Sequence, residues 1–295
     1  MMARNPCIAL GFFDGFHLGH YYLLKSAEAF SRDLSPDCEE KVIITFKEHP
    51  SSLKRPYILL PDERKSKASS LGWRVEFLPG DFKNLSPLEF VNYLRDKRPS
   101  VVVSGYDYRF GKDRKGDVDL LKKTFGESFL CVPPLNVDGI PVKSSLIKER
   151  IREGDVSYAN FLLGYRFFLK GVRVSGKGKG REIGFPTINI LHPHGKVRPL
   201  RGSYAAILEG VRSVAYFGVS PTVSGASFPV WEVHVLDEKM VPELSSLDEM
   251  KLELVSFIRR EEKFFSVEEL SKAIRNDIDQ ALSMFKILSS SSLEK

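Results

Sequence analysis

The stretch CIALGFFDGFHLGHYYLLKSAEAF, residues 7–30, decides the fold of the first half of the chain. It begins with an apolar run that is typical of a buried strand, passes through a glycine-rich turn and continues from residue 18 as a helix. Strand-like runs follow at residues 41–46, 73–78, 100–105 and 128–132, with helical segments between them. Strands that alternate with helices predict a doubly wound, Rossmann-like α/β domain around a parallel sheet.

The pattern changes after Gly164. Short runs of alternating apolar and polar residues, separated by Gly, Pro and Ser, lie at 167–176, 203–210, 213–220, 229–237 and 250–258. This alternation predicts an antiparallel β-barrel or β-sandwich. An amphipathic helix with a capping box at Ser266 and Glu269 follows. We therefore expect two domains, residues 1–164 and 165–295.

The composition is that of an ordinary globular protein, with 42% hydrophobic and 28% charged residues. The net charge of +6 indicates either a solvated basic surface or an anionic partner, and interleaved acidic residues favour small phosphates over nucleic acid. No apolar run approaches the roughly 18–20 residues of a membrane span, and the short apolar stretch near the N-terminus leads us to expect no secretory signal. Three separated cysteines without a CxxC fit a cytoplasmic protein.

The turn GFFDGFHLGH, residues 11–20, joins the first strand to the first helix. Phosphates bind at such places because free backbone N–H groups and the helix dipole favour negative charge. Gly11, Gly15 and Gly19 permit close backbone approach. His17 and His20 are three residues apart, so both imidazoles could stabilise charge that develops on a nucleotide phosphate. The competing interpretation is two surface histidines near a turn.

The segment GKGKGREIGFPTINI, residues 176–190, can cradle phosphate through its backbone N–H groups, although it lacks the order of a P-loop. Thr187 and Asn189 share one face of a strand, and their oxygens suit Mg²⁺. The alternative is a flexible glycine hairpin. In VWEVHVL, residues 230–236, Glu232 shares a face with His234 and is either functional or solvent-facing. His192 and His194 are expected to be loop residues, since their spacing is a weak metal signal.

The turn sequence resembles the signature of the nucleotidyltransferase half of prokaryotic bifunctional riboflavin kinase/FAD synthetases. TFKEHP (45–50), GYDYRFG (105–111) and KSSLIK (143–148) match further motifs of that family in order, and the resemblance covers about residues 7–285. It implies a nucleotidyltransferase domain in which His17 and His20 are catalytic. The resemblance also implies the following nucleotide- and flavin-binding residues: Gly11, Phe13, Asp14, Gly19, His49, Asp107, Arg109, Ser144, Ser145 and Lys148.

GFPTIN similarly resembles the GFPTAN motif of riboflavin kinases, which implies a C-terminal β-barrel kinase domain with a terminal helix. By this resemblance Thr187 and Asn189 bind Mg²⁺ and nucleotide phosphates, with Gly176 and Gly184 in the same loop. The family's EVH segment makes Glu232 the kinase base. FIRREEKF (257–264) resembles a stretch near the flavin, which places Arg259 there.

Three segments depart from the family's pattern. Pro141 and Lys148 stand where the family usually has arginine. A lysine carries the charge but lacks the guanidinium group that makes two parallel hydrogen bonds to a phosphate. VPELSSLDEM replaces a tyrosine-glycine pair, and Ser220-Pro221-Thr222 replaces Arg-Pro-Thr. These changes bear on the efficiency of adenylylation and on the flavin site.

The resemblance implies an enzyme of FAD synthesis that uses ATP twice, first to phosphorylate riboflavin to FMN and then to adenylylate FMN with release of pyrophosphate. Its expected partners are riboflavin, FMN and ATP, with Mg²⁺ as cofactor and neither nucleic acid nor membrane. We expect a monomer or weak self-association. Two alternatives remain open: a riboflavin kinase with a degenerate adenylyltransferase domain, or a non-enzymatic RNA-binding protein.

Overall fold

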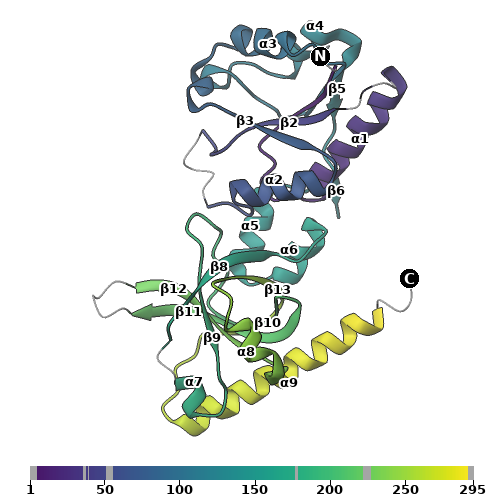
Figure 1. Cartoon of the computed structure of the whole chain (residues 1–295). Helices are drawn as coiled ribbons and strands as arrows, with labels where there is room; N and C mark the ends of the chain where they lie inside the picture. The colour runs from purple at the N-terminus through teal and green to yellow at the C-terminus, as the bar shows by residue number, and fades with distance from the viewer. Residues whose placement is uncertain are drawn as a thin grey trace. The chain divides into compact units, whose positions relative to one another are not determined.

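The first half of the chain forms a five-stranded parallel sheet of order β3-β2-β1-β4-β5 (Figure 1). The computed structural model describes residues 5–35, 38, 40–50, 56–176, 179–221 and 227–291. The strands are Cys7–Leu10 (β1), Lys41–Phe46 (β2), Arg74–Leu78 (β3), Val101–Gly105 (β4) and Phe129–Val132 (β5). The helices of this half are Leu18–Leu34 (α1), Pro61–Ser70 (α2), Pro87–Asp96 (α3) and Val118–Phe125 (α4). The predicted doubly wound domain is therefore confirmed.

The core of this sheet explains why its strands read as continuous apolar runs. Strand β1 is buried along its whole length, because helices cover the sheet on both faces. One face packs Ile8 and Val102 against Leu94 of α3 and Leu121 of α4, and α1 packs against β1, β4 and β5. Strand order reverses between β1 and β4, so the carboxyl end of β1 lies at the crevice where ligands bind in such sheets.

Shorter elements complete this unit. They are the 3-10 turns Gly80–Asn84 (η2), Lys112–Arg114 (η3) and Gly126–Ser128 (η4) and the hairpin of Asn136–Val137 (β6) and Ile140–Pro141 (β7). Helix α3 begins at the predicted capping box: Ser86 Oγ accepts from the Glu89 N–H, and the Glu89 carboxylate accepts from the Ser86 N–H. The sequence did not reveal the β6–β7 hairpin.

The second half is a closed antiparallel barrel of order β10-β11-β12-β9-β8-β13 (Figure 1). Its strands are Phe168–Val174 (β8), Ile188–Leu191 (β9), Gly202–Leu208 (β10), Val211–Pro221 (β11), Ser227–Val235 (β12) and Glu249–Arg260 (β13). The other elements are Ser144–Glu153 (α5), Val156–Leu163 (α6), Lys179–Glu182 (α7), Glu238–Met240 (η5), Val241–Leu244 (α8) and Val267–Ser291 (α9). Of the two predicted architectures, the barrel is correct.

Aromatic rings fill the barrel. Trp231 is fully buried, stacks on Phe217 with ring centroids 4.5 Å apart and meets Tyr204 edge-on at 5.6 Å. On the outside, Ala281 and Phe285 of α9 pack against β10, β11 and β13. In β11 and β12 interior residues therefore alternate with residues that face solvent or α9, as the sequence pattern predicts, whereas the register of β13 shifts twice along β10.

The chain divides into two compact units, Met1–Ser144 and Ser145–Lys295. Helix α6 belongs to the second unit, because the Asn160 side chain donates to Leu254 O of β13 at 2.9 Å and accepts from the Phe167 N–H. The contacts between residues divide the chain after Ser144, whereas the change from helix-and-strand alternation to short strands comes after Gly164. The predicted domain boundary at 164/165 stays a prediction.

Among the described residues, no helix combines the length and the apolar character that a membrane span needs.

Candidate functional site

The turn after β1 brings His17 and His20 into direct contact. His17 is the N-cap residue of α1, and its Nδ1 accepts a hydrogen bond from the His20 N–H at 3.3 Å. The two rings stack with centroids 3.7 Å apart. Burial lowers the pKa of His17 to about 3 and lowers the pKa of His20 well below its ordinary value. Both imidazoles are thus neutral near pH 7, and the proton of His17 is on Nε2 because Nδ1 is an acceptor.

The turn is held in a strained shape by contacts from distant segments. Phe13 and Phe16 adopt left-handed backbone angles, with φ of 54° and 41°. Asp14 is buried, and its Oδ1 accepts from the Ile58 N–H at 2.8 Å and from the Leu59 N–H at 3.2 Å. Ser144 Oγ donates to the Asp14 carbonyl at 2.7 Å. Asp14 and Ser144 therefore fix the turn that carries the histidines.

Arg64 of α2 is a functional candidate that the sequence did not reveal. Only 1% of the residue is exposed, and its Nη1 donates to Phe12 O at 3.0 Å and to Phe46 O at 3.1 Å. Its Nη2 donates to Lys47 O. Burial lowers the pKa of Arg64 to about 10, while the charge of Asp14 acts in the opposite direction. One guanidinium thus ties the carboxyl ends of β1 and β2 together.

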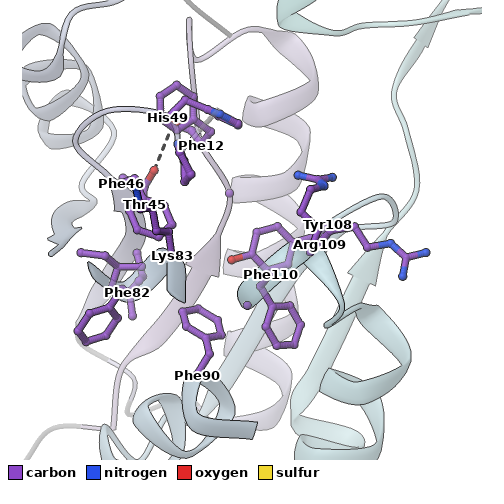
Figure 2. A pocket seen from close by; sticks show the side chains of 16 residues that line it. Phe12, Thr45, Phe46, His49, Phe82, Lys83, Phe90, Tyr108, Arg109 and Phe110 are labelled. Carbon is purple, nitrogen blue, oxygen red and sulfur yellow. Dashed lines mark hydrogen bonds between the residues drawn. The ribbon is translucent and has the colours of Figure 1, made fainter. Parts of the chain in front are cut away.

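A cavity of about 560 Å³ opens at these strand ends (Figure 2). Aromatic rings dominate its wall, and Figure 2 shows Phe46, Phe82, Phe90, Tyr108 and Phe110 around it. Gly11, Thr45 and His49 also line it, together with the cations Lys83, Arg109 and Arg114. Such a wall suits a planar aromatic ligand that carries negative charge.

The structure brings together some of the predicted residues of the first unit. Gly11, His49 and Arg109 line the cavity, and the His49 ring meets Phe12 edge-on at 4.7 Å. Arg109 Nη1 forms an ion pair with Asp117 at 2.8 Å. Asp107 lies outside this lining and pairs with Lys143 at 3.5 Å.

Three predicted residues of the adenylyltransferase site, Ser144, Ser145 and Lys148, lie on α5. Ser145 and Lys148 belong to the second compact unit, and Lys148 is buried. Their assignment to the adenylyltransferase site stays a prediction.

In the barrel, the strand register places Glu232 between two polar neighbours. Glu232 of β12 lies directly opposite Asn189 of β9 and directly opposite Tyr216 of β11. Neighbours across antiparallel strands share a face, so all three lie on the outside of the barrel. Trp231, the next residue on β12, is buried inside. The predicted alternation along this strand is correct, and Glu232 is exposed.

The GFPT segment packs closely against this face. A Cβ at Gly176 would lie 2.1 Å from Asn189 Nδ2, so only glycine lets the amide take its place. Thr187 directly precedes β9. His234 Nδ1 lies 3.0 Å from Pro186 O and donates to it, which ties the segment to β12 and gives this histidine a structural contact. Residues 177 and 178 lie outside the described part of the chain.

Arg259 makes a bidentate ion pair with Asp277 of α9, at 2.8 and 3.0 Å. Asp277 is buried and also accepts from Ser203 Oγ at 2.8 Å. The guanidinium of Arg259 therefore joins β13 to α9, and its expected place near the flavin stays a prediction.

His192 is a buried interior residue. Its Nδ1 accepts from Trp231 Nε1 at 3.2 Å and its Nε2 donates to Lys196 O at 3.3 Å. Burial lowers the pKa of His192 to about 4. Both ring nitrogens are therefore occupied by protein partners.

Both halves of the chain match known families. The FAD synthetase family model matches residues 1–146, and the Riboflavin kinase family model matches residues 163–285. A bifunctional riboflavin kinase/FMN adenylyltransferase of Bacillus subtilis is 30% identical over 95% of this chain and 93% of its own length. Its counterpart in Listeria monocytogenes is 32% identical with the same coverage.

A solved structure has the same architecture throughout. The crystal structure described as a macrolide-efflux protein from Streptococcus pneumoniae is similar with a TM-score of 0.80, 27% identity and 93% coverage of both chains. The fold, the two family models and the relatives all agree over nearly the whole length. The chain therefore belongs to the bifunctional riboflavin kinase/FMN adenylyltransferase family.

Proposed function

We propose that this chain makes FAD in two steps. The second unit transfers the γ-phosphoryl group of ATP to the 5′-hydroxyl of riboflavin and yields FMN. The first unit transfers AMP from a second ATP to FMN and releases pyrophosphate. The turn of residues 11–20 is the observation that carries the proposal, because its Gly11 and Phe12 line the aromatic cavity while its His17 and His20 form a neutral stacked pair suited to phosphate chemistry.

In the adenylyltransferase site, His17 and His20 act as neutral hydrogen-bond donors. An oxygen of the FMN phosphate attacks the α-phosphorus of ATP, the α–β bond breaks, and pyrophosphate leaves without a covalent protein intermediate. The Nε2–H of His17 stabilises charge on the α-phosphate, and a neutral donor needs no proton uptake beforehand. Gly11, Phe13, Asp14 and Gly19 shape the turn around the phosphates.

The aromatic cavity receives the isoalloxazine ring of FMN. Its volume of about 560 Å³ lies within the usual range for cofactor-sized ligands. Lys83, Arg109 and Arg114 line the same wall and offset phosphate charge, while His49 orders the wall through Phe12. Asp107 and Ser144, which belong to the same compact unit, complete the proposed site.

In the kinase site, Glu232 takes the proton of the riboflavin 5′-hydroxyl as that oxygen attacks the γ-phosphorus. Thr187 and Asn189 offer hydroxyl and amide oxygens, which fit Mg²⁺ as a hard cation. When bound there, Mg²⁺ would neutralise part of the negative charge of the ATP phosphates. Gly176 and Gly184 let the loop approach the nucleotide, and Arg259 borders the flavin end. We place this chemistry in the cytoplasm.

Flavin chromatography after incubation with riboflavin, ATP and Mg²⁺ tests the proposal. We expect FMN to appear first and FAD to follow. The second candidate is a kinase alone, which Pro141 and Lys148 favour because each stands where the family has arginine. FMN that accumulates without FAD, also when FMN is supplied directly, would favour that candidate.

A further inference from the structure

A row of side chains crosses the outer face of the barrel. The strand register sets one residue from each of five consecutive strands side by side: Asn189, Glu232, Tyr216, Ser203 and Arg259. Tyr216 is the direct neighbour of Glu232 on the side away from Asn189. The row thus contains a residue beside the proposed base that the mechanism does not use.

The orientation of Tyr216 is fixed at both ends of its side chain. A Cβ at Gly218 would lie 2.6 Å from Tyr216 Cε1, so the ring lies over this glycine. The hydroxyl donates to Glu261 Oε1 at 2.8 Å. Burial and the carboxylates of Glu261 and Glu232 raise the pKa of Tyr216, so its hydroxyl remains a donor near pH 7.

Glu261 is the first residue after β13, and the segment 261–266 leads from it to α9. Its N–H donates to Arg201 O at 3.2 Å, and its carboxylate lies 3.6 Å from Arg201 Nη1. Phe265 on this segment is 92% exposed. An exposed aromatic ring on a tethered segment offers a stacking surface to a planar substrate.

We infer that Tyr216 is a positioning residue of the kinase site, which holds the segment 261–266 beside Glu232 through its hydrogen bond to Glu261. The inference rests on the proposed role of Glu232 as the base. Tyr216 touches neither the hydroxyl proton nor ATP in this scheme. It sets where riboflavin binds relative to the base, so its loss weakens riboflavin binding more than it slows the chemical step.

The test is steady-state riboflavin phosphorylation by the full chain carrying Tyr216→Phe, which removes the hydroxyl and keeps the ring. We expect the KM for riboflavin to rise roughly three- to tenfold, the effect of one partly exposed hydrogen bond, and kcat to change by less than about twofold. Glu261→Ala should give the same pattern, and the double variant should be no worse than the poorer single one. Glu261→Gln keeps an acceptor oxygen and should recover most of the lost affinity.

Tyr158→Phe is the matched control, because the Tyr158 hydroxyl makes no hydrogen bond to any residue that the structure describes. An unchanged KM in Tyr216→Phe, or additive effects of the two single substitutions, would overturn the inference. So would equal losses in phosphorylation and in adenylylation of supplied FMN, since these indicate a general loss of structure. The base assignment is tested separately by Glu232→Gln, whose readout is kcat.

Discussion

The guanidinium carbon of Arg64 lies 4.4 Å from the centre of the Phe12 ring, while its Nη1 donates to the carbonyl of the same residue. A cation stacked on a ring and bonded to its backbone fixes both the ring and the strand end. Phe12 and Phe46, whose carbonyls Arg64 holds, line the aromatic cavity. The buried arginine thus connects the shape of the cavity to the turn that carries His17.

We expect Arg64→Met to lower FAD formation from supplied FMN at least tenfold, because three carbonyls lose their donor while the apolar stem is kept. Riboflavin phosphorylation should persist, since its residues lie in the other unit. Rates of both steps, with a melting curve, check this. Lys67→Met on the same helix is the control. Equal activity of the two variants in adenylylation would contradict the role of Arg64.

His17→Ala and His20→Ala should each abolish FAD formation and leave riboflavin phosphorylation largely intact. Each substitution removes an imidazole that we propose as a neutral hydrogen-bond donor to the α-phosphate. Both steps are measured side by side by flavin chromatography. His194→Ala serves as the control because His194 is an exposed loop residue. If either turn variant loses the kinase step as severely as adenylylation, the assignment of two separate sites is wrong.

The buried state of His17 also predicts a pH dependence of stability. The pKa falls from its ordinary value of 6.5 to about 3 in the folded chain. Between these values the unfolded chain binds a proton that the folded chain does not, so the free energy of unfolding falls as pH decreases. The slope approaches about 1.4 kcal/mol per pH unit for this residue, and His20 shifts in the same direction.

The free energy of unfolding is measured by denaturant titration at several pH values between 7 and 4. Hydrogen exchange of peptides from β1 and α1 reports on the part of the chain that contains His17. His17→Asn should show a shallower loss of stability on acidification than the parent chain. Parallel pH profiles for the two proteins would show that His17 is not the buried neutral group described above.

Local patterns predicted much of this molecule. The β1–turn–α1 unit is contiguous in sequence, so both its elements and its histidines could be recognised together. The alternation along β12 placed Glu232 and Trp231 on opposite faces of the strand, and the structure shows that Trp231 faces the interior. In each case the sequence pattern on which the prediction depends lies within a few residues along the chain.

Partners that come from distant segments could not be predicted. Arg64 lies in a polar helix, and nothing in its surroundings shows that its side chain reaches Phe12 and Phe46. Likewise the pairing of Asp277 with Arg259 depends on how α9 docks on the barrel. The sequence could not show that Tyr216 is a neighbour of Glu232. Alternation predicts which face of a strand a residue lies on, but not the register in which β11 pairs with β12.

Gly176→Ala should reduce riboflavin phosphorylation roughly tenfold or more. The added Cβ would lie 2.1 Å from Asn189 Nδ2, so the amide has to leave the position that we propose for metal and phosphate binding. The Mg²⁺ dependence of the kinase rate should shift to higher concentration. Gly80→Ala is the control, since its Cβ would meet nothing within 4 Å. An unchanged Mg²⁺ dependence would show that Asn189 is not needed in that place.

Glu232 is the residue on which the proposed kinase mechanism depends. A general base must accept the proton of the 5′-hydroxyl, and an amide of the same shape cannot do so. Glu232→Gln should therefore lower kcat of riboflavin phosphorylation by roughly 10²–10⁴-fold, the usual contribution of a positioned base. Binding of riboflavin and ATP should change little, and FAD formation from supplied FMN should survive.

Glu249→Gln makes the same substitution on an exposed position of β13 and should leave both steps unchanged. If Glu232→Gln phosphorylates riboflavin as fast as this control, Glu232 is a solvent-facing strand residue and the base lies elsewhere. Asp237, which follows β12 and caps η5, is then the next candidate. Its Oδ1 already accepts from the Lys239 N–H at 3.2 Å, however, and a carboxylate that caps a turn is less free to reach a substrate proton. We therefore propose Glu232, which lies directly opposite Asn189 on one neighbouring strand and Tyr216 on the other, ahead of Asp237.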